Sequence, residues 1–324
     1  MHRPGIGRRA ALSAGIIALA GLAVGCGREA GPATAAAAPL ELAHQYGSAK
    51  VPAKPARVVT MSNSWTDALI ALDVPITAEF VTKGYAGKGN RFAWTPEHDS
   101  KIIEMTTIGE VDFEQLASFD PDLILAGYVG DQQVYQKLEG VAPTIPVMDK
   151  KAVLDTWQDV TTTAGRIFGQ QDKATALVKN VEQELEDFKQ EFPTAQGKTF
   201  VFGQLAADGQ IGLVAAESDA AAKLIASTGL RLFPKLKEVV KGGDRVLVSQ
   251  ERTDLLEADV LVLWPLAGGP ETFEKTPGWN DLPAVRNQAT VFVTNDNAVG
   301  FGSPTIYSVP YVLDLLRPAV KAAT

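Results

Sequence analysis

The chain has 324 residues, of which 46% are hydrophobic and 21% charged, and its formal net charge at pH 7 is −8. This composition excludes a disordered protein, and the length suffices for two domains that each bury a core. The net negative charge argues against nonspecific binding to nucleic acids.

The first 25 residues are typical of an export signal. Three arginines precede an apolar run from residue 10 to residue 24, which is too short for a permanent membrane span. The run ends in Ala23-Val24-Gly25-Cys26, which resembles a bacterial lipobox except that Ala23 replaces the more usual leucine. We expect Cys26 to become the lipidated first residue of the mature protein; an ordinary cleaved signal is the alternative. Removing residues 1–25 leaves 27 basic and 38 acidic side chains, a net charge of −11.

Cys26 is the only cysteine. The folded part therefore contains no internal disulfide, no cysteine metal cage and no cysteine nucleophile. Residues 27–39 are rich in Ala, Gly and Pro and predict a flexible tether. We therefore assign residues 1–25 to the export signal and residues 26–40 to the lipidated cysteine and its tether.

The first folded segment has a strand–helix–strand pattern. Residues 57–61 predict a strand, a helix begins near Ser64, and residues 76–80 predict the next strand. Residues 82–100 interrupt the pattern with several glycines, and a loop of this length inside a domain is usually functional or mobile. Further helices and strands extend this N-terminal lobe over residues 41–168.

Residues 172–192 predict one long helix, about 30 Å in length. Its apolar residues recur at steps of four and three and form one stripe; they are Ala174, Val178, Val181, Leu185, Phe188 and Phe192. Pro193 and Gly197 end the helix. We assign residues 169–196 to a stiff connecting helix and residues 197–324 to a C-terminal lobe.

The C-terminal lobe continues the α/β pattern. We expect strands at residues 199–205, 246–248 and 291–294, a helix at 218–227, and a closing helix from about 305 to 316. Pro310 lies inside this last segment and predicts a kink or a later helix start.

Two stretches, 112–127 and 249–264, repeat one pattern. In each, a polar residue that can cap a helix stands two places before a glutamate, and an aspartate opens an apolar run at the same interval after it. The pairs are Glu114 with Asp122 and Glu251 with Asp259. The apolar runs are typical of buried parallel strands. The repeat predicts two similar α/β lobes with a cleft between them, joined by the single long helix.

In this order, behind a lipobox, the segments resemble a family: the solute-binding proteins of bacterial ABC importers whose lobes are joined by a backbone helix, particularly receptors for iron–siderophores, haem or cobalamin. The resemblance covers about residues 52–318. It rests on Pro55-Ala56-Arg57-Val58-Val59, residues 67–75, 113–116 with 121–124, 141–144, 249–251 and 258–261. Asp73 stands where the family usually has glycine. The resemblance implies lobes that move little on binding.

By this resemblance, Glu114 and Glu251 match the paired surface glutamates that dock onto arginines of the membrane permease. A carboxylate in the first turn of a helix is favoured by the helix dipole, and one glutamate per lobe would set the register of a pseudo-symmetric partner. The alternative is that each glutamate only complements a helix dipole.

Ligands of α/β lobes collect beyond the carboxyl ends of the strands. The ligand-binding candidates follow predicted strands or lie in the 82–100 loop; they are Trp65, Arg91, Trp94, Tyr128, Trp264 and Phe301. Aromatic walls suit a bulky, partly apolar chelate, and a guanidinium can bind hydroxamate or carboxylate oxygens. The alternative for each aromatic residue is core packing, which we favour for Trp157 and Trp279.

We therefore expect a monomeric, extracytoplasmic, lipid-anchored receptor that captures a ferric siderophore, with the hydroxamate type favoured, and delivers it to an ABC permease. No cofactor and no directly bound metal ion are expected, because the three histidines, His2, His44 and His98, belong to no cluster with ligand spacing.

Three alternatives differ in ligand or class. Haem or cobalamin would suit the same fold, with Tyr85 or Tyr128 as an axial haem ligand. A surface lipoprotein would use the cleft for a protein partner. A secreted enzyme is the remaining class, but no Gly-x-Ser-x-Gly, His-Glu-x-x-His or Walker pattern supports it.

Overall fold

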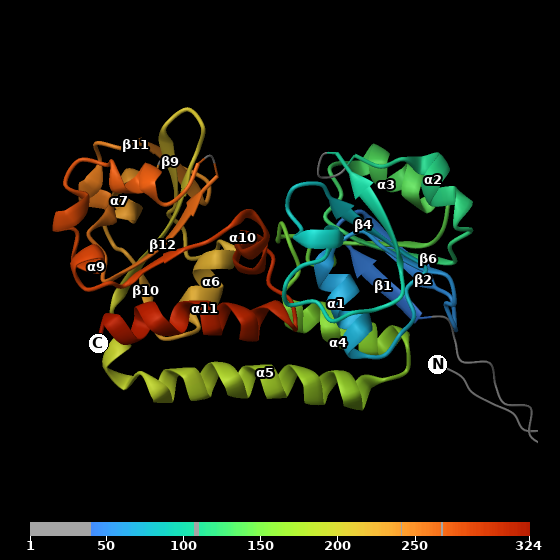
Figure 1. The fold of residues 1–324 in the computed structure, drawn as a ribbon. Helices are drawn as coiled ribbons and strands as arrows, with labels where there is room; N and C mark the ends of the chain where they lie inside the picture. The colour runs from blue at the N-terminus through green and yellow to red at the C-terminus, as the bar shows by residue number, and fades with distance from the viewer. Residues whose placement is uncertain (1–39, 107–109, 241, 267) are drawn as a thin grey trace, which may run out of the picture. The chain divides into compact units, whose positions relative to one another are not determined.

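The fold is built around two large β-sheets, one over each end of a long helix (Figure 1). The computed structural model describes residues 40–106, 110–240, 242–266 and 268–324. Cys26, the export signal and the tether up to residue 39 lie outside these ranges. The described residues belong to one contact unit, 38–324. None of the helices in these ranges combines the length and the apolar character of a membrane-spanning segment.

The N-terminal sheet has five parallel strands in the order β5-β4-β3-β6-β7. Its strands are β3 (Val58–Thr60), β4 (Ala78–Thr82), β5 (Lys101–Met105), β6 (Leu123–Gly127) and β7 (Thr144–Pro146). Its helices are α1 (Asn63–Ala71), η1 (Lys88–Asn90), α2 (Phe113–Ser118), α3 (Gln132–Glu139) and α4 (Trp157–Ile167). A hairpin of β1 (Leu40–His44) and β2 (Gly47–Val51) precedes them.

Strand β6 shows why this sheet is buried on both faces. All five of its residues are buried, and alternate side chains enter different cores: Leu123 and Leu125 join one apolar cluster, Ile124 and Ala126 the other. A continuous apolar run is what a parallel strand covered on both sides requires.

The C-terminal sheet has six strands and mixes both directions. The order is β11-β9-β8-β12-β13, with β10 also beside β8; β9 is antiparallel to β8 and β11. Its strands are β8 (Thr199–Leu205), β9 (Gln210–Val214), β10 (Arg231–Leu232), β11 (Arg245–Ser249), β12 (Val260–Pro265) and β13 (Thr290–Phe292). Its helices are α6 (Ala220–Ala226), α7 (Leu236–Val239), η3 (Thr253–Leu256), α8 (Glu271–Glu274), η4 (Trp279–Asp281), α9 (Pro283–Arg286), α10 (Asn295–Gly302) and α11 (Ser308–Ala322).

Helix α11 starts later than residue 305, as the position of Pro310 suggests. Its first residue is Ser308, so Pro310 falls in the first turn, where the missing N–H has no helical partner to lose.

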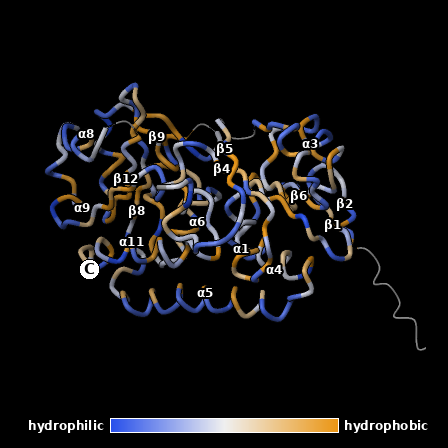
Figure 2. Tube along the Cα trace, turned by 45° about the vertical axis from the view of Figure 1, so that its right-hand side comes forward, coloured by the Kyte–Doolittle hydropathy of each residue, from blue (hydrophilic) through white to orange (hydrophobic). Residues whose placement is uncertain are grey.

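Helix α5 (Gln171–Glu191) runs beneath both sheets and is followed by the short turn η2 (Pro193–Ala195). Figure 2 shows the sheet strands as largely hydrophobic and α5 as a mixture of hydrophobic and hydrophilic residues. Its predicted stripe is buried, and the stripe is shared: Ala174 belongs to a core of the N-terminal lobe, whereas Val181, Leu185 and Phe188 belong to the core of the C-terminal lobe.

The two aspartates of the repeated pattern perform the same task in each lobe. Asp122 precedes β6 and accepts hydrogen bonds from the backbone N–H groups of Ala56 and Arg57, at the start of the neighbouring β3. Asp259 precedes β12 and accepts from the N–H and hydroxyl of Thr199, the first residue of the neighbouring β8. Each carboxylate thereby joins the amino ends of two adjacent parallel strands.

The predicted fold class is confirmed: the chain forms two α/β lobes joined by one long helix. The predicted boundaries at residues 40, 168 and 196 remain predictions.

Candidate functional site

A cavity of about 380 Å³ opens at the carboxyl ends of β3, β4, β6 and β12. From the N-terminal lobe, residues 61–67, 79–82, 127–128 and 153–155 contribute to its wall. From the C-terminal lobe come Trp264, the α10 residues Ala298, Val299 and Gly302, and Ser303, which follows the helix. Both lobes therefore line one site, at the edge of the sheets where α/β proteins bind ligands.

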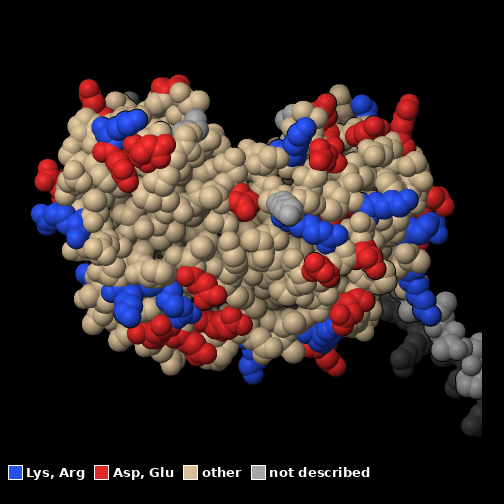
Figure 3. Space-filling model, viewed as in Figure 1, with Lys and Arg blue, Asp and Glu red and all other residues tan. Residues whose placement is uncertain are grey.

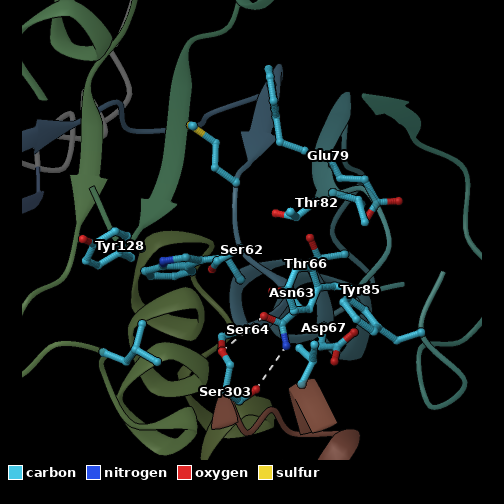
Figure 4. Close-up of a pocket in the computed structure, with 18 of the residues that line it drawn as sticks. Ser62, Asn63, Ser64, Thr66, Asp67, Glu79, Thr82, Tyr85, Tyr128 and Ser303 are labelled. Carbon is cyan, nitrogen blue, oxygen red and sulfur yellow. Dashed lines mark hydrogen bonds between the residues drawn. The ribbon is translucent and has the colours of Figure 1, made fainter. Parts of the chain in front are cut away.

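The amino end of α1 connects the lobes at the floor of this cavity. The Asn63 amide donates to the Ser303 carbonyl at 3.1 Å, and the Ser64 hydroxyl donates to the Pro304 carbonyl at 3.3 Å. Figure 4 shows Asn63 and Ser64 directed toward Ser303. These bonds hold α1 against the segment that follows α10.

Gly127 lets the end of β6 approach α1 closely. Its φ is +65°, and a Cβ atom at this position would lie 3.0 Å from the Ser62 hydroxyl oxygen. A residue with a side chain would be strained in this conformation and would meet Ser62. The glycine thus allows β6 to end close against Ser62, just before Tyr128.

Aromatic side chains stand on several sides of the cavity. Tyr128 is 45% exposed and lies across the cavity from Tyr85 (Figure 4). Trp264 is largely buried, its indole N–H donates to Asn295 Oδ1 at 2.8 Å, and its ring meets Tyr85 edge-on at 6.5 Å. Such walls offer flat apolar area with polar groups at the rim.

Asp67 is a buried carboxylate on α1 that accepts three hydrogen bonds from two other segments. It accepts from the Trp94 indole at 3.0 Å, from the Thr95 hydroxyl at 2.7 Å and from the Thr305 hydroxyl of the C-terminal lobe. Burial raises the pKa of Asp67 to about 6, although all three hydrogen bonds oppose the shift. The carboxylate therefore connects α1, the 82–100 loop and the start of the last helix.

The described lining of the cavity contains three carboxylates, Asp67, Glu79 and Asp155, but one guanidinium, Arg91. Asp155 accepts from the backbone N–H groups of Met148 and Asp149, and burial raises its pKa. Arg91 itself is engaged, since it donates to His98 Nδ1 and to the His98 carbonyl, both at 2.7 Å. The charge balance of the wall is therefore negative.

The structure brings four of the predicted ligand residues together: Trp65, Arg91, Tyr128 and Trp264 all line the cavity. Trp65 is fully buried in its wall, and its indole nitrogen has no hydrogen-bond partner among the described residues.

Trp94 and Phe301 are not among the lining residues. The Trp94 ring is buried between the lobes, where it stacks on Phe92 at 4.7 Å and meets Tyr311 at 5.5 Å. Phe301 is fully buried and packs on Phe202 at 5.6 Å. It lies on α10, whose residues 298, 299 and 302 face the cavity, so helical spacing turns position 301 toward the core.

Glu79, Asp155 and the α10 residues were missed as cavity residues. Asn63 and Ser64 were also missed; they lie between the predicted strand 57–61 and Trp65, so the strand-end reasoning that selected Trp65 would have found them. The α10 residues could have been found from the helical spacing of apolar and small residues after the strand near 291.

Glu114 and Glu251 are both exposed. Glu114 stands in the first turn of α2, where Asp112 caps the helix by accepting from the Gln115 N–H at 2.9 Å. Glu251 differs: it lies in a turn between β11 and η3, with its N–H 3.3 Å from the Ser249 hydroxyl. The helix-dipole argument thus applies to Glu114 alone.

No group of three His, Cys, Asp or Glu side chains in the described ranges is placed to hold a metal ion. Tyr85 and Tyr128, the two candidate haem ligands, both line the cavity.

The sequence was compared with protein families and with known proteins. A family model described as periplasmic binding protein matches residues 58–297. The lipoprotein YhfQ of Bacillus subtilis, whose name describes an ABC transporter substrate-binding protein, is 24% identical over 322 residues, 95% of this chain and 97% of the relative. The Fe(3+)-citrate-binding protein YfmC of the same organism is 24% identical over 250 residues, 75% and 74% of the two chains.

Among solved structures, PiaA of Streptococcus pneumoniae in complex with ferrichrome superposes with a TM-score of 0.71 at 23% identity. The match covers 88% of this chain and 99% of PiaA. The two structures share their fold.

Proposed function

Because the chain belongs to the periplasmic binding protein family, we propose that it binds a ferric siderophore of the hydroxamate type in the cavity and delivers it to the permease of an ABC importer. The family consists of binding proteins rather than enzymes. The relatives named above are described with different iron chelates, ferric citrate for one and ferrichrome for the other. The choice of chelate therefore has to come from the cavity itself.

The charge balance of the cavity carries the proposal. Three carboxylates and one guanidinium line it. A trianionic catecholate or a citrate complex would enter a wall of like charge, which costs binding free energy in a partly buried site. A neutral ferric hydroxamate avoids this cost.

The rest of the lining suits such a chelate. Tyr85, Tyr128 and Trp264 offer apolar area, and Ser62 and Asn63 offer neutral polar groups. On the face of both lobes that Figure 3 shows, acidic and basic side chains are interspersed. Selectivity would then reside in the cavity and not in a patch of one sign on this face.

The mature protein would be a monomer held at the cell membrane by a lipid on Cys26. Metabolic labelling with palmitate, lost in Cys26→Ala, tests the anchor. Glu114 and Glu251, one exposed on each lobe, would contact the permease.

Tryptophan fluorescence of the mature protein tests the ligand. We expect quenching by ferrichrome, a neutral ferric trihydroxamate, at concentrations at least tenfold below those needed for a ferric catecholate or ferric citrate. Trp264→Phe should remove much of the signal, whereas Trp279→Phe, a core residue, should leave it. Tighter binding of ferric citrate or the catecholate would refute the hydroxamate assignment.

Haem is a second candidate because both tyrosines that could bind its iron line the cavity. Hemin titration decides this: a Soret band that is lost in Tyr85→Phe or Tyr128→Phe, together with no quenching by ferrichrome, would replace the first proposal.

A further inference from the structure

Three side chains form a connected chain beside the cavity. Arg91 Nη1 lies 2.7 Å from His98 Nδ1, and His98 Nε2 lies 2.9 Å from Glu79 Oε1. The Ser100 hydroxyl also donates to Glu79 Oε1, at 2.6 Å. The His98 and Glu79 side chains are only 10% and 6% exposed, and all three members line the cavity.

The chemistry of these groups decides which atom carries the proton. A guanidinium has donors only, so His98 Nδ1 accepts the bond from Arg91. The carboxylate of Glu79 has acceptors only, so His98 Nε2 carries the hydrogen and donates to it. This arrangement requires one tautomer of the neutral imidazole.

The same Nδ1 has a second neighbour, which can form a hydrogen bond only if Nδ1 carries a hydrogen. It lies 2.9 Å from the Pro96 carbonyl oxygen, which can only accept. Without a proton, Nδ1 holds Arg91. With a proton, Nδ1 donates to Pro96, and Arg91 Nη1 loses its acceptor and faces an N–H group instead.

We propose that His98 is a positioning residue that aims the Arg91 guanidinium at the oxygens of the bound chelate, and that a second proton on its imidazole releases Arg91 and weakens ligand binding. This rests on the proposed function, because it takes the chelate as the ligand that Arg91 meets. The bond from Arg91 Nη2 to the His98 carbonyl remains in both states, so the guanidinium turns away from its place without leaving the cavity wall.

Two charged side chains contact the His98 ring, and two more lie nearby. Glu79 on β4 lies against Nε2, and Arg91 lies against Nδ1. Glu97 and Asp99 line a shallow depression shared with Arg91 and His98. Asp67 lies near enough to Glu79 for the Glu79 carboxylate to contribute to the raised pKa of Asp67. Asp67, with a pKa of about 6, changes charge in weak acid. The variants used in the test therefore retain Asp67, so that any pH dependence caused by Asp67 would persist in all of them.

The test is the pH dependence of ferrichrome affinity in the mature protein, from about pH 8 to about pH 5, the interval in which histidines change charge. Wild type should lose about tenfold in affinity on acidification, the value of one charge-assisted hydrogen bond. His98→Asn, whose Oδ1 can still accept from Arg91 but cannot be protonated, should bind a few-fold more weakly than wild type at neutral pH and show a flat profile. Arg91→Ala should also be flat, and Glu97→Gln should keep the wild-type slope.

Two results would overturn the proposal: a flat wild-type profile, or a slope that persists in His98→Asn or Arg91→Ala. If wild type binds no ferrichrome at any pH, the proposed hydroxamate function fails instead. The protonation of His98 Nδ1 is then measured in the protein without ligand. Nitrogen NMR of the imidazole signal that disappears in His98→Asn should show an unprotonated Nδ1 at about pH 8. A protonated Nδ1 there would also reject the positioning role of His98.

Discussion

In the N-terminal lobe a helix follows the first central strand, whereas in the C-terminal lobe a tight turn follows its counterpart. Strand β3 leads into α1 before the chain returns as the parallel β4, so the amino end of α1 stands at the cavity. Strand β8 turns through residues 206–209 and returns as the antiparallel β9. No helix start is therefore available at that position of the second lobe, which contributes Trp264 and the end of α10 instead. The kind of connection after a strand decides what each lobe offers the ligand.

The largest expected effect comes from substituting two aromatic residues that come after strands, one in each lobe. Phe301→Ala should lower the free energy of unfolding by about 3–5 kcal/mol, because it empties a fully buried site. Tyr128→Ala should change stability by about 0.5 kcal/mol or less but weaken ferrichrome binding by about tenfold, because it removes an exposed cavity wall. Urea denaturation and fluorescence titration measure both quantities. A stable Phe301→Ala protein with impaired binding would reverse the assignment of the two residues.

A second test uses Asp67, which lies on the helix that the C-terminal lobe lacks at this position. Its pKa is about 6 in the folded protein against an ordinary 3.8, so the folded state keeps the proton longer as the pH rises. Stability should therefore fall by about 3 kcal/mol between about pH 4 and about pH 6. Urea denaturation across this range should show the decrease of unfolding free energy with pH in wild type and no such decrease in Asp67→Asn. Thr305→Val, which removes one donor to the carboxylate, should displace the slope to higher pH; an unchanged slope in Asp67→Asn would assign it to another group.

A third test compares the two aspartates that join strand ends. Asp122→Ala should cost about 2 kcal/mol, since its hydrogen bonds to two backbone N–H groups are lost. Asp259→Ala should cost about 1 kcal/mol, because this side chain is more exposed, 38% against 24%. Urea denaturation of both alanine variants, with the corresponding asparagine substitutions as controls, measures the two losses in the free energy of unfolding. If the loss at residue 259 clearly exceeds that at 122, exposure is not what separates the lobes.

The smallest change in the isolated protein is expected for the exposed glutamates. A Glu114→Ala, Glu251→Ala double variant should fold and bind ferrichrome as wild type does, yet fail to support uptake by cells. Ligand titration and iron uptake measure the two properties. Lost ligand affinity would count against a docking role.

The parts of the fold that follow from local pattern could be predicted from the sequence. The stripe from Ala174 to Phe188 predicted α5, and the two Asp-led apolar runs predicted β6 and β12, because a buried parallel strand must be apolar along its whole length. The antiparallel β9 was missed. Its signal was present as Asp208-Gly209, a turn dipeptide, before the alternating Ile211 and Leu213.

The candidate site was predictable at the carboxyl ends of strands, as for Tyr128, which directly follows β6, and Trp264, which lies near the end of β12. It was not predictable for Phe301, since α10 lies between the strand and the cavity and its periodicity decides which side chains face inward. Nor could pattern alone place Trp94, whose position depends on its hydrogen bond to Asp67 and on its contact with Tyr311 of the other lobe. Contacts between segments this distant in sequence leave no local signal.

The shared stripe of α5 has a consequence for how a transporter could recognise a loaded receptor. Bending this helix would draw apolar side chains out of both lobes at once, so a large jaw-like closure is energetically costly. A receptor whose conformation is nearly the same with and without ligand cannot signal ligand binding to the permease through a conformational change. If the chain acts as proposed, the permease would have to sense the cargo itself, through the part of the iron complex left uncovered at the mouth between the lobes.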